Sequence, residues 1–220
     1  MEVKQTEPVR GSPQSGRIPA MIPGVILAAG LSSRMGQPKA LLPAGSGGPS
    51  FVRRLSATLL EGGVADVIVV GRPDDGALRA EIDRLGTGVR FVANPRADEG
   101  QLSSVLAGLN AADRPGVHGV LVTPVDVPLI LPGTVDALLT AFATRHAPIV
   151  RATYHGRHGH PVIFGREVFE ALRHTDPSVG AKAVVRSHAA DVVDLEVDDP
   201  SVLHDIDRPD DYVRAFNTQE

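Results

Sequence analysis

Residues 24 to 43 read GVILAAGLSSRMGQPKALLP, and this stretch decides how the rest of the chain is interpreted. It begins with apolar residues typical of a buried strand and continues as a loop that contains Gly30 and Gly36. Glycine lets a backbone turn sharply and lets a ligand approach exposed N–H groups, an arrangement that favours anions. Arg34 and Lys39 add two cations that suit phosphate oxygens. The loop therefore predicts a phosphate site, with a triphosphate as the expected ligand.

The spacing of the glycines argues against two common phosphate loops. No Gly-Lys-Ser/Thr follows the strand, as a Walker loop requires, and Gly30 with Gly36 does not form the Gly-x-Gly-x-x-Gly signature of dinucleotide-binding folds. One alternative stays open at this point. The two glycines could simply turn the chain while Arg34 and Lys39 are solvated.

Outward from this loop, short β-branched runs alternate with longer segments of helical period. That alternation is typical of an α/β fold, in which a mostly parallel sheet is connected by crossover helices. After Phe142 the expected strands come closer together, which predicts an added antiparallel part. The expected strands cover residues 24–28, 66–70, 89–93, 119–123, 148–153, 160–164 and 192–197.

The first expected helix covers residues 50–60, where Phe51, Val52, Leu55 and Leu59 form one apolar stripe and Ser50 is the expected N-cap. Similar stripes predict helices at residues 77–85, 103–111, 134–142, 167–172 and 181–187. Ser103 and Ser104 are the candidate N-caps of the helix that starts near residue 103.

The composition limits the class of protein. The 220 residues suit one domain, expected over residues 21–220, after a polar leader over residues 1–20 that is expected to be disordered. With 22 Lys plus Arg against 26 Asp plus Glu, the chain lacks the basic surplus of a nucleic-acid binder. It contains no cysteine, which excludes disulfides and suits a cytoplasmic location. No apolar run approaches the ~20 residues that span a bilayer, so no membrane contact is expected.

Three loops, over residues 30–42, 94–101 and 123–132, are expected to face one cleft, because ligands of open α/β sheets bind beyond the carboxyl ends of the strands. Asn94 and Gln101 carry amides that both donate and accept hydrogen bonds, as recognition of a base requires. Asp126 and the distant Asp207 form the kind of carboxylate pair that Mg²⁺ prefers beside phosphate oxygens. Each aspartate could instead cap a helix or close a turn.

The string LAAGLSSRMGQPKALL, residues 27–42, resembles the signature of the molybdenum-cofactor cytidylyl- and guanylyltransferases. The resemblance implies a three-layer α/β/α Rossmann-like nucleotidyltransferase fold, with a mostly parallel sheet and a small antiparallel addition near the acceptor site. It also implies that Lys39 and Arg34 contact the triphosphate and take part in catalysis together with Asp126. The other residues of this loop that it assigns to nucleotide binding are Leu27, Ala28, Ala29, Gly30, Leu31, Ser32 and Ser33.

Two further motifs extend the resemblance. In ANPRADEGQLSSVLAG, residues 93–108, the positions that correspond to base and ribose contacts of the family are Asn94, Gln101 and Ser104. In VTPVDVPLI and HDIDRPDDY, Asp126 and Asp207 correspond to the family's magnesium ligands. Arg208 stands where the family usually has Thr, and Asp205 is an alternative second ligand.

The acceptor side is expected in YHGRHGHPVIFGREVFEAL, residues 154–172. Its three histidines permit a zinc site, but histidines separated by glycines on a turn more often make a polar loop. By resemblance, residues 159–164 border the second substrate, and Arg157, His160 and Pro161 hold an anionic acceptor such as a pterin phosphate.

The resemblance therefore implies a Mg²⁺-dependent transfer of CMP from CTP to a phosphorylated molybdopterin-type acceptor, with release of pyrophosphate. CTP is favoured because the family pairs Ala-Ala-Gly, as found at Ala29, with cytidylyl transfer and Ala-Gly-Gly with guanylyl transfer. A molybdoenzyme or its maturation chaperone is the expected protein partner. Three alternatives stay open: guanylyl transfer, transfer to another phosphorylated acceptor such as methylerythritol phosphate or a sugar phosphate, and a non-catalytic nucleotide carrier.

Overall fold

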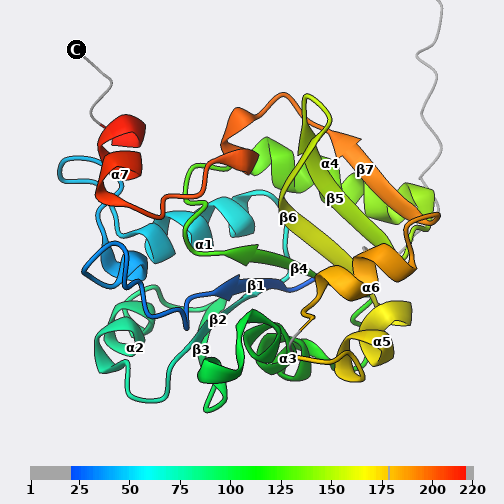
Figure 1. Ribbon diagram of the computed structural model, residues 1–220, viewed down its shortest axis with the longest axis horizontal. Helices are drawn as coiled ribbons and strands as arrows, with labels where there is room; N and C mark the ends of the chain where they lie inside the picture. Colours follow the sequence, from blue (N-terminus) through cyan, green and yellow to red (C-terminus); the bar gives the residue numbers. More distant parts are fainter. Residues whose placement is uncertain (1–20, 178, 217–220) are drawn as a thin grey trace, which may run out of the picture.

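The computed structural model describes residues 21–177 and 179–216, so the expected leader over residues 1–20 lies outside the described residues. In the described part of the chain, seven strands form one sheet in the order β3-β2-β1-β4-β6-β5-β7 (Figure 1). The strands are β1 (Gly24–Leu27), β2 (Val67–Gly71), β3 (Val89–Ala93), β4 (Gly119–Pro124), β5 (Ile149–Tyr154), β6 (Arg157–Gly165) and β7 (Val192–Glu196).

One strand runs against its neighbours. β1 is parallel to β2 and β4, β2 to β3, and β5 to β7, whereas β6 is antiparallel to both β4 and β5. The expectation of a mostly parallel sheet with a small antiparallel part is confirmed. The carboxyl ends of β1 to β4 meet at one edge, which is where such sheets bind their ligands.

Helices cover both faces of the sheet and make the three expected layers (Figure 1). One face carries α1 (Phe51–Glu61), α2 (Gly76–Asp83) and α4 (Pro132–Arg145), and the other carries α3 (Gln101–Ala112), α5 (Phe169–Arg173) and α6 (Lys182–Ser187). The remaining helical elements are the short turns η1 (Lys39–Leu41), η2 (Ala97–Glu99), η3 (Arg166–Val168) and η4 (Pro200–Leu203) and the final helix α7 (Pro209–Phe216). Over residues 21–177 and 179–216, no helix is long and apolar enough to cross a membrane.

Alternate residues of β1 enter the two cores of the molecule. Ile26 packs on the side of α1, and Val25 packs on the side of α3. α3 lies especially close to β1, because Gly108 has no side chain: a Cβ there would lie 2.3 Å from Cγ1 of Val25. The strand that leads into the glycine loop is therefore fixed from both faces.

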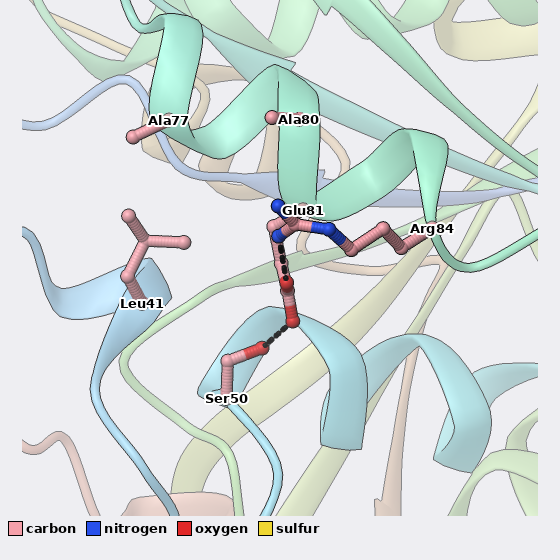
Figure 2. A pocket seen from close by; sticks show the side chains of 6 residues that line it. All are labelled: Leu41, Ser50, Ala77, Ala80, Glu81 and Arg84. Atoms are coloured by element: carbon pink, nitrogen blue, oxygen red, sulfur yellow. Dashed lines mark hydrogen bonds and ion pairs between the residues drawn. The ribbon is translucent and has the colours of Figure 1, made fainter.

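Ser50 is the N-cap of α1, as expected. The Ser50 hydroxyl accepts a hydrogen bond from the N–H of Arg53 and donates one to the carboxylate of Glu81 on α2 at 2.8 Å (Figure 2). Arg84, further along α2, also donates to Glu81. Ser50, Glu81 and Arg84 line a groove between η1 and α2. Their hydrogen bonds to one another connect the start of α1 to α2.

The predicted N-caps of α3 are wrong. The helix begins at Gln101, and the cap position belongs to Gly100, whose φ of 102° is readily adopted only by glycine. Ser103 and Ser104 lie inside the first turn, where their hydroxyls accept hydrogen bonds from Nδ2 of Asn94 at 2.8 and 3.0 Å. The backbone conformation of Gly100 thus starts the helix before the serines.

Candidate active site at the carboxyl edge of the sheet

The loop after β1 folds back on itself around Ser32. This residue has a positive φ of 51°, and its carbonyl oxygen accepts hydrogen bonds from the N–H groups of Met35 and Gly36. Its hydroxyl accepts a hydrogen bond from the N–H of Lys39 at 3.2 Å, while the Met35 side chain is buried in the core. The loop is therefore pinned at its middle and at its end, and it brings Lys39 to the edge of the sheet.

Lys39 lies between two aspartates from distant parts of the chain. Its Nζ donates to Oδ2 of Asp126 at 3.0 Å and also donates to the carboxylate of Asp207. Burial works against the charge of Lys39, but hydrogen bonds and attraction from Asp207 and Asp126 outweigh it and raise the pKa of the ammonium. A charged ammonium therefore marks the point where the three side chains converge.

Arg34 joins this group from the exposed side. Its Nη1 donates to Oδ2 of Asp207 at 2.8 Å. The hydrogen bond from Lys39, together with the charges of Lys39 and Arg34, holds the pKa of Asp207 below its ordinary value. We call Arg34, Lys39, Asp126 and Asp207 the charged cluster. The alternative of a solvated side chain is wrong for Lys39, which is buried between the two carboxylates, whereas Arg34 stays largely exposed while it bonds to Asp207.

The two aspartates serve the charged cluster rather than a helix end. At the start of α4, Oδ2 of Asp199 accepts hydrogen bonds from the N–H of Leu131 and the hydroxyl of Thr134. These polar groups at the start of α4 are therefore bonded to Asp199 and not to Asp126. Asp205, the alternative second ligand, has a raised pKa, because its carboxyl is partly shielded from water and is repelled by Asp126 and Asp207.

Two residues of the charged cluster, Lys39 and Asp126, line a cleft of about 390 Å³ at the ends of β1, β2 and β4, which is closed on one side by η2 and the start of α3. The structure thus brings segments far apart in the sequence to one cavity. The lining residues that the sequence also indicated are Leu27, Ala28, Ala29, Gly30, Leu31, Ser32, Lys39, Gln101, Ser104 and Asp126.

Asn94 lies differently from the other expected base contacts. It is 1 % exposed, its Nδ2 donates to Ser103 and Ser104, and its Oδ1 accepts a hydrogen bond from the N–H of Arg96. Asn94 therefore orders the segment that leads into α3, and a direct contact with a base stays a prediction. Ser33 remains in the loop beside the cleft, with its side chain exposed.

The sequence reasoning missed a charged pair in the cleft. Arg72 directly follows β2, and its Nη2 donates to both carboxylate oxygens of Asp98, at 2.9 and 3.1 Å. Both residues line the cleft on the side of β2 and β3, whereas Asp126 follows β4 on the other side of β1. The rule that ligands bind at carboxyl strand ends would have indicated Arg72, the first residue after β2.

His160 links the expected acceptor side to the charged cluster. Burial lowers its pKa, against the attraction of the nearby Asp126 carboxylate. Its Nδ1 is buried and has no hydrogen-bond partner within the part of the chain that the structure describes. Pro161 is buried beside it, whereas Arg157 lies exposed at the tip of the hairpin that joins β5 to β6. His160 therefore lies within electrostatic range of Asp126, and Arg157 lies at the surface.

The chain matches the MobA-like NTP transferase domain over residues 24–192. It belongs to this family. Nicotine blue oxidoreductase of Paenarthrobacter nicotinovorans is 32 % identical over 206 residues, which are 89 % of this chain and 96 % of the relative. A probable molybdenum cofactor guanylyltransferase of Rhodopirellula baltica is 37 % identical over 131 residues, 59 % of either chain. The molybdenum cofactor cytidylyltransferase of Escherichia coli is 24 % identical over 192 residues, 87 % of this chain and 93 % of the relative.

Among solved structures, Rv0371c of Mycobacterium tuberculosis in complex with manganese superposes on this MobA-like transferase with a TM-score of 0.72. It is 28 % identical, and the match covers 90 % of this chain and 99 % of that structure. The relatives include both guanylyl- and cytidylyltransferases, so membership of the family supports a nucleotidyltransferase without separating GTP from CTP.

The donor set of this MobA-like transferase fits a divalent cation. The carboxylates of Asp126 and Asp207 approach the same ammonium and therefore face one point. Hard cations such as Mg²⁺ take one or two carboxylates together with phosphate oxygens and water. Within residues 21–177 and 179–216, no group of three or more His, Asp or Glu side chains is arranged to hold a metal ion. The three histidines of residues 155–160 therefore form no zinc site among the described residues. A ligand with phosphate oxygens would complete the coordination at Asp126 and Asp207.

Proposed function

We propose that this MobA-like transferase is a cytoplasmic enzyme that transfers CMP from CTP to a phosphorylated molybdopterin-type acceptor and releases pyrophosphate. The observation that carries the proposal is the charged cluster, in which Lys39 meets Asp126 and Asp207 at the mouth of the cleft. Cations for phosphates and carboxylates for a metal ion are the two kinds of group that this chemistry requires.

The reaction needs no nucleophile from the protein. An oxygen of the acceptor phosphate attacks the α-phosphorus of CTP and forms a new P–O bond. The bond between the α-phosphorus and the oxygen that bridges to the β-phosphate breaks, and pyrophosphate leaves with its electron pair. Because the acceptor phosphate is already ionised near neutral pH, catalysis consists of positioning and charge stabilisation.

The side chains of the charged cluster have separate tasks in this reaction. Lys39 and Arg34 exchange the Asp207 carboxylate for oxygens of the β- and γ-phosphates and stabilise the charge of the leaving pyrophosphate. Asp126 and Asp207 hold the metal ion, Mg²⁺ in this proposal, which supplies positive charge against the phosphate oxygens when it is bound. The exposed N–H groups of the loop after β1 add a cradle for the triphosphate.

Ala29 supports CTP over GTP. Its side chain is buried and its residue lines the cleft, so the methyl group leaves less room beside the base. We expect Ala29→Gly to relax the preference toward GTP, by at most roughly 1–3 kcal/mol, because one methyl group is a modest discriminator. The ratio of kcat/KM values for CTP and GTP measures this shift. Equal turnover of CTP and GTP by the unmutated protein would contradict the assignment.

His160 supports an anionic acceptor. Its unpaired Nδ1 is buried near Asp126, and a buried polar atom without a partner usually meets a ligand or water. A phosphate bonded to His160 would lie beside the charged cluster, as an attacking oxygen must. The product would pass to a molybdoenzyme or to its maturation chaperone.

Two observations favour other candidates. A relative named as a guanylyltransferase favours GMP transfer, and the relative named as nicotine blue oxidoreductase favours an oxidoreductase. The remaining candidates are nucleotidyl transfer to methylerythritol phosphate or to a sugar phosphate, and nucleotide binding by a carrier without turnover. The transferase candidates all release pyrophosphate and differ in the nucleotide or the acceptor that they require, whereas a carrier or an oxidoreductase releases none.

Release of pyrophosphate tests the proposal. We expect the purified protein with Mg²⁺ and a molybdopterin-type acceptor to release pyrophosphate from CTP faster than from GTP, ATP or UTP. Asp126→Ala should lose turnover yet retain part of the nucleotide affinity, since Lys39 and the loop remain. CTP binding without pyrophosphate would support a carrier, and release only with another phosphorylated acceptor would reassign the second substrate.

A further inference from the structure

Asp207 is held from two sides by contacts that the proposed reaction does not use. On one side, Ile206 is buried, and its N–H donates to the carbonyl oxygen of Asp126 at 2.8 Å. On the other side, the N–H of Asp207 donates to Oδ2 of Asp211 at 3.1 Å. The first contact ties the two aspartate loops together. The second fixes the backbone from which the Asp207 side chain projects.

Asp211 lies in the first turn of α7 and has a second partner. Its Oδ2 also accepts a hydrogen bond from the N–H of Arg208, the residue before the helix, at 2.9 Å. Ser, Thr, Asp or Asn is preferred at that position, because these side chains accept a hydrogen bond from the first turn. Arginine has no acceptor atom in its side chain. The start of α7 and the backbone of Asp207 therefore depend on the same carboxylate.

α7 is fixed in turn to the segment that follows Lys39. The Tyr212 hydroxyl donates to the carbonyl oxygen of Pro43 at 2.8 Å, and its ring stacks on Phe51 with centroids 6.2 Å apart. Phe216 packs against both rings. In Figure 1, α7 lies beside the loops that precede α1. The helix therefore gives Asp211 a fixed place relative to the loop of Lys39.

We propose that Asp211 is a positioning residue, which aims the Asp207 carboxylate at Asp126 through the Asp207 N–H and not merely through the stability of α7. This inference rests on the proposed function, because it concerns the metal ion that Asp126 and Asp207 would share. Outer partners of metal ligands typically change metal affinity about 10- to 100-fold when they are removed.

The effect of Asp211 on the metal site can be measured without turnover. The measured quantity is the increase in CTP affinity that Mg²⁺ causes. We would titrate CTP into the full-length protein by calorimetry, once with Mg²⁺ and once with EDTA. Asp211→Ala should weaken CTP binding about tenfold in Mg²⁺ and leave it nearly unchanged in EDTA. Asp211→Asn should restore most of the loss, because its carbonyl oxygen still accepts hydrogen bonds. Asp210→Ala, an exposed neighbour in the same turn, is the matched control.

A double variant separates positioning from helix stability. Arg208→Thr supplies a side-chain acceptor for the first turn of α7 but none for the N–H of Asp207. In Asp211→Ala/Arg208→Thr the melting temperature should recover, while the Mg²⁺-dependent loss of CTP affinity should remain. This variant also guards against a single variant that folds poorly.

Three results would overturn the proposal. Asp211→Ala could bind CTP as the wild type does in Mg²⁺, it could lose the same factor in Mg²⁺ and in EDTA, or the double variant could recover affinity together with stability. Each of these leaves the proposed function intact, because the wild type still binds CTP with Mg²⁺. A wild type in which Mg²⁺ brings no gain in CTP affinity would instead overturn the proposed function and this inference with it.

Discussion

At the scale of single residues, the ammonium of Lys39 sets the geometry of the charged cluster. It is the group that both Asp126 and Asp207 contact, and it is almost completely enclosed by the protein. Two carboxylates that face one point repel each other unless a cation lies between them. In the free protein that cation is Lys39, and with nucleotide bound the proposed function gives the place to a metal ion while Lys39 turns to the phosphates.

Removal of this ammonium should cost more turnover than affinity. We expect Lys39→Met to lower kcat about 10²- to 10³-fold, the range found when one preorganised charge-stabilising donor is lost. Pyrophosphate release at saturating CTP measures the effect. Arg84→Met, which removes an exposed cation on α2 away from the cleft, is the control and should keep wild-type turnover.

His160 predicts a pH dependence of stability. Because burial lowers its pKa below the ordinary 6.5, the unfolded chain takes up a proton at a higher pH than the folded chain does. The stabilising effect of a neutral His160 is therefore complete above pH 6.5 and is lost as the pH falls toward the folded pKa. We expect the free energy of unfolding to fall more steeply on acidification in the wild type than in His160→Gln. Urea unfolding from neutral to acidic pH measures both free energies. An equal fall with pH in the wild type and in His160→Gln would speak against this prediction.

At the scale of elements, the position of α3 determines one wall of the cleft. Its first turn carries Gln101 and Ser104, and its middle packs on β1 through Gly108. The close contact leaves no room for a side chain, so the helix holds its distance from β1 only while residue 108 is glycine. The same strand ends at the loop that carries Arg34 and Lys39 of the charged cluster.

An added methyl group at this contact should destabilise the fold. In Gly108→Ala the new Cβ would lie 2.3 Å from Val25 and 3.2 Å from Val70, and we expect a cost of about 1–3 kcal/mol in the free energy of unfolding. Gly133→Ala on α4 is the control, because nothing lies within 4 Å of its added Cβ. That control should be neutral or stabilising by about 0.4–1 kcal/mol. Urea unfolding of both variants checks the difference.

At the scale of the whole molecule, the positions of the strands along the chain and the cleft could be predicted because their signals are local, whereas the order of the strands in the sheet was not predicted. The β-branched runs marked the strands, and the rule for carboxyl ends placed the loops after β1 and β4 at one edge. The convergence of Asp126 and Asp207 needed more than such rules. Asp207 directly follows no strand, so the rule for carboxyl ends could not place it, and its carboxylate chemistry together with the resemblance to a family motif indicated it.

Features that depend on backbone conformation or on distant partners could not be predicted. The φ of Gly100 starts α3 before the serines that resemble caps, and burial turns the amide of Asn94 toward these serines. The role of Asp211 depends on the backbone of Asp207, which no spacing in the sequence reveals. The first feature depends on a local backbone conformation, the second on a buried hydrogen bond, and the third on a contact between residues four positions apart.

A crystal structure grown with CTP and Mg²⁺ tests the central claim most directly. We expect the triphosphate on the loop after β1, a metal ion between Asp126 and Asp207, and Lys39 within hydrogen-bond distance of a phosphate oxygen. A nucleotide bound away from this cleft, or one bound here with Lys39 still held between the two carboxylates and no metal at either, would contradict the account.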